Sequence, residues 1–188
     1  DWSFASVNRF IVATLILIDV AVFAFSYLVE LPQLKNTIRS VEPTVSGWIV
    51  CLICYPPFNA VLYFFFDRKL EGAAPPGTDI PSEIAITALW AIYVSATVAL
   101  GLKSSNLTNR GIVSRGPYAF VRHPAYGAKV TLWIISAIAL GTMSISLAFV
   151  LVGVYALRAL TEERHLSADP AYVEYCARVR YRFIPGVI

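Results

Sequence analysis

The amino-acid sequence predicts an all-α integral membrane protein with about five transmembrane helices. Of its 188 residues, 57% are hydrophobic and 14% are charged, and the mean hydropathy is +0.66. An average soluble domain carries about 25% charged residues. The chain also contains four long apolar stretches, and a spanning helix needs roughly 20 mostly apolar residues. The net charge of +3 comes without a basic tract, so we expect no nucleic-acid partner.

The first three apolar stretches each have the length of one transmembrane helix. They cover residues 10–29, 45–66 and 83–102. Pro56 and Pro57 should kink the second stretch because proline cannot continue the helical hydrogen bonds. Asp19 interrupts the first stretch, and an acid inside a membrane is a functional candidate. The favoured interpretation of Asp19 is nevertheless a hydrogen bond to a neighbouring helix, through Asn59 or a Ser or Thr.

The fourth apolar stretch, residues 130–160, is too long for one ordinary span. Its midpoint reads LGTMSIS, and the weak helix formers Gly141, Thr142, Ser144 and Ser146 indicate a turn. We therefore predict a helical hairpin with arms at residues 128–140 and 144–160. The first arm is roughly 20 Å long at 1.5 Å per residue, so it should be thin, tilted or re-entrant.

The distribution of Lys and Arg favours five crossings over four. With five crossings, twelve of the cations lie on one side and three on the other, whereas four crossings give seven against eight. Cytoplasmic loops of membrane proteins carry the excess of cations. The N-terminus should therefore lie outside, and both the loop that starts at Lys103 and the C-terminal tail should lie in the cytoplasm. This divides the chain into three N-terminal helices, residues 1–102, and a catalytic region, residues 103–188.

The loop before the hairpin has the composition of a binding pocket. In GPYAFVRHPAYGAKV, Pro124 biases His123 away from helical geometry, and His123 and Tyr126 are aromatic groups with polar tips. Gly111, Gly116 and Gly127 permit close approach of the backbone. The two cysteines of the C-x-x-C at residues 51–54 have no acidic or His partner, so they are predicted to pack, and no metal is expected.

A second polar group follows the hairpin. Arg158, Glu162 and His165 are spaced i, i+4 and i+7 and share one helical face, whereas Glu163 points about 100° away from Glu162. Snorkelling and surface pairing would explain these residues alone. Because five crossings bring them to the same side as the His123 loop, we predict one pocket built from both segments.

Three motifs together resemble a known family. They are GPYAFVRHPAYGA at residues 116–128, the pattern R-x-x-x-E-E-x-x-L that starts at Arg158, and YVEYCARVRYRFIP at residues 172–185. The combination resembles the isoprenylcysteine carboxyl methyltransferase family and its relatives among membrane phospholipid methyltransferases. The resemblance extends over residues 102–185.

The resemblance implies an integral membrane enzyme that transfers a methyl group from S-adenosylmethionine, leaving S-adenosylhomocysteine. It implies a lipophilic acceptor, such as a prenylcysteine carboxylate, that reaches the site from the bilayer. Arg158 would be the catalytic residue at the methyl acceptor. The residues that the resemblance places at the cofactor are Lys103, Arg110, Gly111, Ile112, Val113, Tyr118, His123, Pro124, Ala125, Tyr126 and Glu162.

Elementary chemistry is consistent with a carboxylate acceptor. A carboxylate with a pKa of about 3.5 is already ionised at neutral pH, so its methylation needs alignment and exclusion of water rather than a base. A lipid amine as acceptor would instead need a base, for which His123, His165 or Glu163 are candidates. Two further alternatives remain open, an NADPH-dependent membrane reductase similar to sterol reductases and a lipid-binding protein without enzymatic activity.

Overall fold

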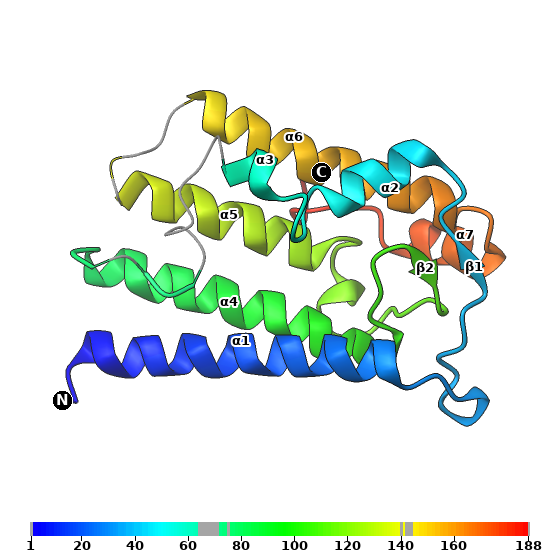
Figure 1. Ribbon diagram of the computed structural model, residues 1–188, viewed down its shortest axis with the longest axis horizontal. Coiled ribbons are helices and arrows are strands. Elements are labelled where there is room, and N and C mark those ends of the chain that lie inside the picture. Colours follow the sequence, from blue (N-terminus) through cyan, green and yellow to red (C-terminus); the bar gives the residue numbers. More distant parts are fainter. Residues whose placement is uncertain (1, 64–71, 75, 140, 142–144, 188) are drawn as a thin grey trace.

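The helices of the computed structural model form a bundle in which α1, α4, α5 and α6 run side by side (Figure 1). The structure describes residues 2–63, 72–74, 76–139, 141 and 145–187. The α-helices are α1 (Phe4–Leu28), α2 (Val45–Leu52), α3 (Ala60–Tyr63), α4 (Ile80–Leu100), α5 (Pro124–Ala139), α6 (Ile145–Leu166) and α7 (Pro170–Arg178). Three 3-10 turns, η1 (Pro32–Leu34), η3 (Gly101–Lys103) and η4 (Gly116–Ala119), and two short strands, β1 (Ser40–Val41) and β2 (Thr108–Asn109), complete the described elements.

The first and third apolar stretches are helices that begin earlier than predicted. Ser3 caps α1 and Asp79 caps α4, and each side-chain oxygen accepts from a backbone N–H three residues on, as is usual at helix N-termini. Within the described parts of the chain, two helices are long and apolar enough to cross a membrane by length and composition, Phe4–Leu28 and Ile80–Lys103. Two of the roughly five predicted spans are thus candidate membrane helices by length and composition.

The second apolar stretch is not the single kinked helix that we predicted. Helix α2 ends at Leu52, the chain turns through residues 53–59, and α3 begins at Ala60. Pro56 and Pro57 lie in this break and lack the N–H groups that a continuing helix would need. Residues 64–66, which complete the predicted span, lie outside the described residues.

The predicted hairpin is found, with longer arms. Helix α5 begins at Pro124 rather than at residue 128, and α6 continues to Leu166. Gly141 lies in a turn with φ of 65°, a left-handed conformation that glycine adopts without steric cost. The turn at Gly141 is confirmed, while Thr142, Ser144 and the side chain of Ser146 lie outside the described part of the structure.

The core of the bundle lies between α1, α4, α5 and α6. Ile86 and Trp90 of α4, Leu132 and Trp133 of α5 and Tyr155 of α6 are buried together. Outward-facing side chains of α1 are largely apolar and exposed, in keeping with its length and composition as a candidate membrane span.

The structure also assigns a partner to the buried acid. Asp19 of α1 accepts hydrogen bonds from the hydroxyl groups of Thr97, at 2.6 Å, and Tyr93, at 3.3 Å, both on α4. The interpretation of Asp19 as a link between helices is therefore confirmed, with Thr97 and Tyr93 in place of Asn59. Such a link satisfies a polar group that would be costly to bury alone.

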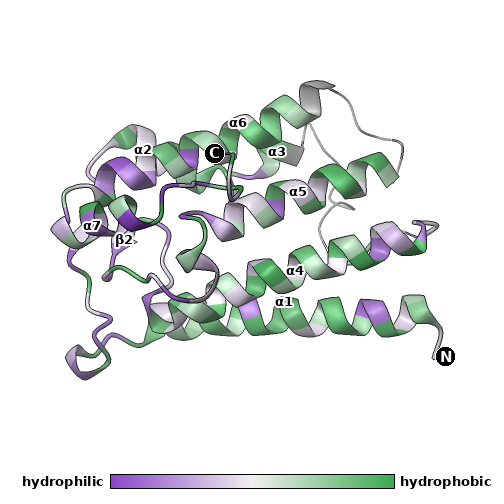
Figure 2. Cartoon of the chain, turned by 180° about the vertical axis from the view of Figure 1, so that it is seen from behind, coloured by the Kyte–Doolittle hydropathy of each residue, from purple (hydrophilic) through white to green (hydrophobic). Residues whose placement is uncertain are grey.

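Polar residues gather at one end of the bundle (Figure 2), around β2, α7 and the loops beside them. Strand β1 pairs antiparallel with β2, with Ser40 opposite Asn109. The residue 30–43 linker is thereby joined to the loop that follows α4. After α7 the tail returns to α5, where backbone N–H groups of Arg122 and His123 donate to carbonyls of Tyr181 and Arg182 at 2.9 and 2.8 Å.

Candidate active site

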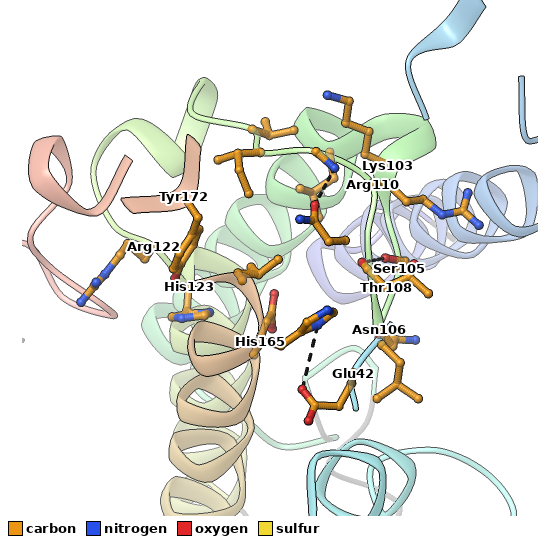
Figure 3. A pocket seen from close by; sticks show the side chains of 18 of the residues that line it. Glu42, Lys103, Ser105, Asn106, Thr108, Arg110, Arg122, His123, His165 and Tyr172 are labelled. Carbon is orange, nitrogen blue, oxygen red and sulfur yellow. Dashed lines mark hydrogen bonds and ion pairs between the residues drawn. The ribbon is translucent and has the colours of Figure 1, made fainter. Parts of the chain in front are cut away.

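Two cavities open into the polar end of the bundle, and they share part of their walls. The first, which we call the loop cavity, encloses an empty volume of about 860 Å³ that is partly open to solvent. Its walls come from residues 103–113, the linker before α2, the polar end of α6 and helix α7. The second, the helix cavity, has an empty volume of about 600 Å³ and lies deeper, among α1, α4, α5 and α6. Figure 3 shows the loop cavity from close by.

The loop after α4 is held in place by α1. Arg110 is buried and donates from Nη1 to the carbonyl oxygen of Ser26 at 2.6 Å, and the Ser26 hydroxyl donates to the carbonyl of Ser104 at 2.7 Å. Gly111 has φ of 98°, and a Cβ there would approach Arg39 and Lys103 within 3.0–3.1 Å. The positive φ and the close approach of these two cationic side chains therefore favour glycine at this position.

The His123 segment is fixed by Glu163. The carboxylate of Glu163 lies 3.2 Å from Nε2 of His123, 3.3 Å from Nε of Arg122 and 3.0 Å from Nε of Arg182. Burial raises the pKa of Glu163, but the hydrogen bond and charge of His123, together with Arg182 and Arg122, outweigh it and lower the pKa below its ordinary value. The His123 ring is stacked parallel to Tyr126, with centroids 5.3 Å apart. Glu163 thus holds the loop, α6 and the C-terminal tail together.

Arg158 lies where the two cavities meet and is only 5% exposed. Its Nη2 donates to the hydroxyl of Tyr55 at 3.0 Å and to Oδ1 of Asn106 at 2.7 Å. The rings of Tyr55 and Tyr126 lie 5.1 and 5.0 Å from its guanidinium carbon, within the range of cation–π attraction. Its Nε is buried and has no hydrogen-bond partner.

Glu162 lines both cavities beside Arg158. The hydroxyl of Tyr126 donates to Oε2 of Glu162 at 2.6 Å, so the carboxylate is attached to α5 while it faces the shared wall. Adjacent acids on α6 therefore have separate surroundings, because Glu163 points toward Arg122, His123 and Arg182.

The opposite wall of the loop cavity is formed by the linker before α2. Glu42 is buried, and its carboxylate lies 3.1 Å from Nη2 of Arg164 and 3.9 Å from Nδ1 of His165 (Figure 3). Burial raises the pKa of Glu42, but hydrogen bonds from Thr44 and the ion pair with Arg164 outweigh it and lower the pKa. The hydroxyl of Ser40 lies 2.9 Å from Nε2 of His165.

The structure brings most of the predicted site residues together. Those that line the loop cavity are Lys103, Arg110, Gly111, Ile112, Val113, Tyr118, His123, Arg158 and Glu162. Ala125 and Tyr126 line the helix cavity instead. Pro124 faces neither and lines an apolar cavity between α4, α5 and the tail, where it serves as the first residue of α5.

Asn106, Tyr55 and Glu42 are among the cavity residues that the sequence did not indicate. Asn106 stands in a loop of ordinary polar composition and Tyr55 in an apolar stretch, so neither belongs to a recognisable spacing. Only contacts between segments far apart in the chain, such as the hydrogen bond from Arg158 to Asn106, assign them to the site.

The chemistry of the loop cavity fits a polar ligand such as the predicted cofactor. Besides Nε of Arg158, the buried Nε of Arg110 and the Oγ1 of Thr108 lack partners, and all three residues line this cavity. A buried polar atom without a partner costs about 1–3 kcal/mol, which a hydroxylated and charged ligand would recover. The described residues contain no group of three or more side chains suited to a metal ion, and the walls contain hydrogen-bonding groups instead.

The segment that carries this site matches a known family. Residues 84–168 match the isoprenylcysteine carboxyl methyltransferase family. The resemblance is thereby confirmed for the first two motifs, while the third, at residues 172–185, lies beyond the match. The match indicates a membrane methyltransferase. No curated protein matches the chain.

The isoprenylcysteine carboxyl methyltransferase match covers most of α4, the loop cavity segment, the hairpin and the polar end of α6. It includes Arg158, Glu162, Glu163 and the His123 loop, but stops before α7 and the tail. Glu42, Tyr55 and Tyr172 therefore contribute to the cavities from segments outside the matched region.

Proposed function

We propose that this protein is an S-adenosylmethionine-dependent membrane methyltransferase that esterifies the carboxylate of a prenylcysteine-like acceptor. One observation carries the proposal: Arg158 is buried, lies between the loop cavity and the helix cavity, and retains an unpartnered Nε. A buried guanidinium with a free donor is suited to bind a carboxylate.

The two cavities divide the binding task. The loop cavity would hold S-adenosylmethionine, with Glu162 toward its hydroxyl or ammonium groups and the buried donors of Arg110 and Thr108 as further polar contacts. The helix cavity would hold the head of the acceptor, since its wall includes Phe23, Tyr93 and Tyr155 from the apolar helices. Both ligands would then meet at Arg158.

The cofactor supplies an activated methyl group when it is bound. The acceptor carboxylate needs no base, because its pKa of about 3.5 leaves it ionised at neutral pH. Arg158 binds and orients the carboxylate, and the rings of Tyr55 and Tyr126 shield the guanidinium from water. Orientation of two reactants in a dry site lowers a barrier by several kcal/mol, up to about 10. An ester forms without the transfer of a proton.

The same proposal gives the protein a sidedness. Helix α7, the 103–123 loop and the C-terminal end of α6 lie at one end of the bundle, opposite the C-terminal end of α5 (Figure 1). An excess of cations marks the cytoplasmic side, so the active site would face the cytoplasm and the N-terminus would lie outside, in a multi-pass arrangement.

Calorimetry on the detergent-purified protein tests the cofactor. We expect S-adenosylhomocysteine to bind and NADPH not to bind. If only NADPH binds, the methyltransferase proposal is wrong and a reductase is favoured. If neither ligand binds, a lipid-binding protein without enzymatic activity is favoured.

Radiolabelled methyl transfer tests the acceptor. Farnesylated N-acetylcysteine should be methylated, its preformed methyl ester should not, and phosphatidylethanolamine should be inert. If only phosphatidylethanolamine is methylated, the acceptor is an amine rather than a carboxylate, and the reaction needs a base at the site.

A further inference from the structure

The guanidinium of Arg158 is held by groups that the proposed reaction does not itself require. Asn106 Oδ1 accepts from Nη2 of Arg158 at 2.7 Å and from the hydroxyl of Tyr55 at 2.8 Å, and the same Tyr55 oxygen accepts from Nη2 at 3.0 Å. One nitrogen of the guanidinium is therefore bonded to two neighbours that are also bonded to each other. Such a closed set of three hydrogen bonds fixes both the position and the rotation of the group.

The observed orientation of the Asn106 amide satisfies both of its polar atoms. Its Nδ2 donates to the hydroxyl of Tyr27 at 2.8 Å, on the side away from Arg158. If the amide were reversed, its NH₂ group would face the donors of Arg158, which accept nothing. The network therefore has one satisfied arrangement, in which the accepting oxygen is turned toward the arginine.

This network determines which part of Arg158 is available to a ligand. The rings of Tyr55 and Tyr126 lie 5.1 and 5.0 Å from the guanidinium carbon, and Nη2 is used by Tyr55 and Asn106. The buried Nε, without a partner, remains. We infer that Asn106 and Tyr55 are positioning residues that present the free edge of Arg158, including Nε, to the carboxylate of the methyl acceptor. This inference rests on the proposed function.

The three groups of this network come from separate segments of the chain, and Arg158 is a flexible side chain that the network holds in place. Arg158 comes from α6, Asn106 from the loop between η3 and β2, and Tyr55 from the turn between α2 and α3. An arginine side chain loses up to about 2 kcal/mol of rotamer freedom when it is fixed. Fixing it before the acceptor arrives removes that cost from binding.

Two variants change the network with little change in volume. Asn106→Leu removes the accepting oxygen, and Tyr55→Phe removes the hydroxyl while it keeps the ring over Arg158. We expect Asn106→Leu to raise KM for the farnesylcysteine acceptor about tenfold or more, as the loss of a hydrogen bond to a charged group implies. Tyr55→Phe should raise it less, and kcat and the affinity for S-adenosylhomocysteine should change less than KM in both.

Tyr27→Phe is the matched control. It also deletes a tyrosine hydroxyl from the network, but among the described residues that hydroxyl bonds to Nδ2 of Asn106 and not to Arg158, and Tyr27 is 54% exposed. We expect KM to stay close to that of the wild type. If Tyr27→Phe and Tyr55→Phe have equal effects on KM, the hydroxyl of Tyr55 has no special role in orienting Arg158.

Asn106→Asp covers the case in which the leucine variant fails to fold. It keeps the shape and the accepting oxygen, but its charge neutralises Arg158. Binding of the farnesylcysteine carboxylate should therefore weaken while the thermal midpoint stays near that of the wild type, whereas a purely structural asparagine would tolerate this change. If the Asn106 variants weaken the binding of S-adenosylhomocysteine as much as the binding of the acceptor, the inference is wrong and Asn106 belongs to the cofactor site.

Calorimetric binding of farnesylcysteine, measured beside the transfer assay, separates the two proposals. Wild-type protein that binds the acceptor in an Asn106-dependent way yet transfers no methyl group would refute the reaction and keep the positioning role. Wild-type transfer with unchanged KM in Asn106→Leu would refute the positioning role and keep the reaction. A wild-type protein that neither binds the acceptor nor transfers would refute both.

Discussion

Tyr126 of α5 donates a hydrogen bond of 2.6 Å to Glu162 of α6, at the wall that the two cavities share. Residues 36 positions apart in the sequence thereby fix the carboxylate next to Arg158. The hydroxyl that holds Glu162 and the ring that covers Arg158 belong to the same side chain. Changes at these three residues should therefore separate cofactor binding from binding of the acceptor.

Glu162→Ala should weaken the binding of S-adenosylhomocysteine. The variant removes a charged acceptor that faces the loop cavity, and the loss of a hydrogen bond to a charged group costs about 1.5–3 kcal/mol, or roughly 10- to 100-fold in Kd. Calorimetry on the detergent-purified protein measures the change. Tyr126→Phe, which keeps the carboxylate but frees it from α5, should have a smaller effect, and the opposite order of the two effects would contradict the role given to Glu162.

Arg158→Ala should abolish methyl transfer to the prenylcysteine while it leaves the affinity for S-adenosylhomocysteine nearly intact. The reason is that its free Nε is proposed to bind the acceptor. Arg158→Lys is the companion variant, because lysine keeps the charge but cannot reproduce the planar fork, and it should recover little of the transfer. Equal losses of cofactor affinity in Arg158→Ala and Glu162→Ala would refute this division between the two residues.

Glu163→Gln should lower the thermal midpoint. Its carboxylate is shared by Arg122, His123 and Arg182, and removing one partner from a partly buried ion network costs about 2 kcal/mol or more. Glu174→Gln, an exposed glutamate of α7, is the control and should change the midpoint little. A midpoint for Glu163→Gln equal to that of Glu174→Gln would show that the tail is held by other contacts.

Acid should release the same contacts. The pKa values of Glu163 and Glu42 are lowered in the folded protein from the ordinary value of 4.5, so their stabilising contributions are complete above pH about 4.5 and are lost as the pH falls through the lower folded pKa. Thermal midpoints measured from pH 7 to 3 should decline mainly below pH about 4.5. In Glu163→Gln the decline of the midpoint should be shallower. A decline as steep as in the wild type would show that protonation of Glu163 does not contribute to it.

Cysteine labelling tests the topology on either side of α6. In a background without the three native cysteines, Gly141→Cys should react with a membrane-impermeant maleimide from outside only, since Gly141 lies in the turn before α6. Ala168→Cys, just after the other end of α6, should react only after the membrane is permeabilised. Labelling of both positions from the same side of the membrane would contradict the five-crossing topology.

Much of the fold could be predicted from periodicity and length. The apolar stretches that became α1 and α4, and the turn at Gly141, follow from residues that are neighbours in the chain. The bounds were less predictable, because Ser3 and Asp79 extend their helices by capping groups that lie outside the apolar runs. The break near Pro56 and Pro57 exceeded the predicted kink, since two adjacent residues without N–H groups remove consecutive helical bonds.

The sequence by itself determined the chemistry that the protein carries: the R-H-P-x-Y loop, the face shared by Arg158 and Glu162, and the family that these motifs resemble. It could not indicate that Glu163 binds Arg122, His123 and Arg182, nor indicate Asn106, Tyr55 or Glu42. Those assignments depend on hydrogen bonds and ion pairs between residues up to 122 positions apart. Only the tertiary structure decides such contacts, because packing of the helices, rather than any local spacing, determines which polar groups face one another.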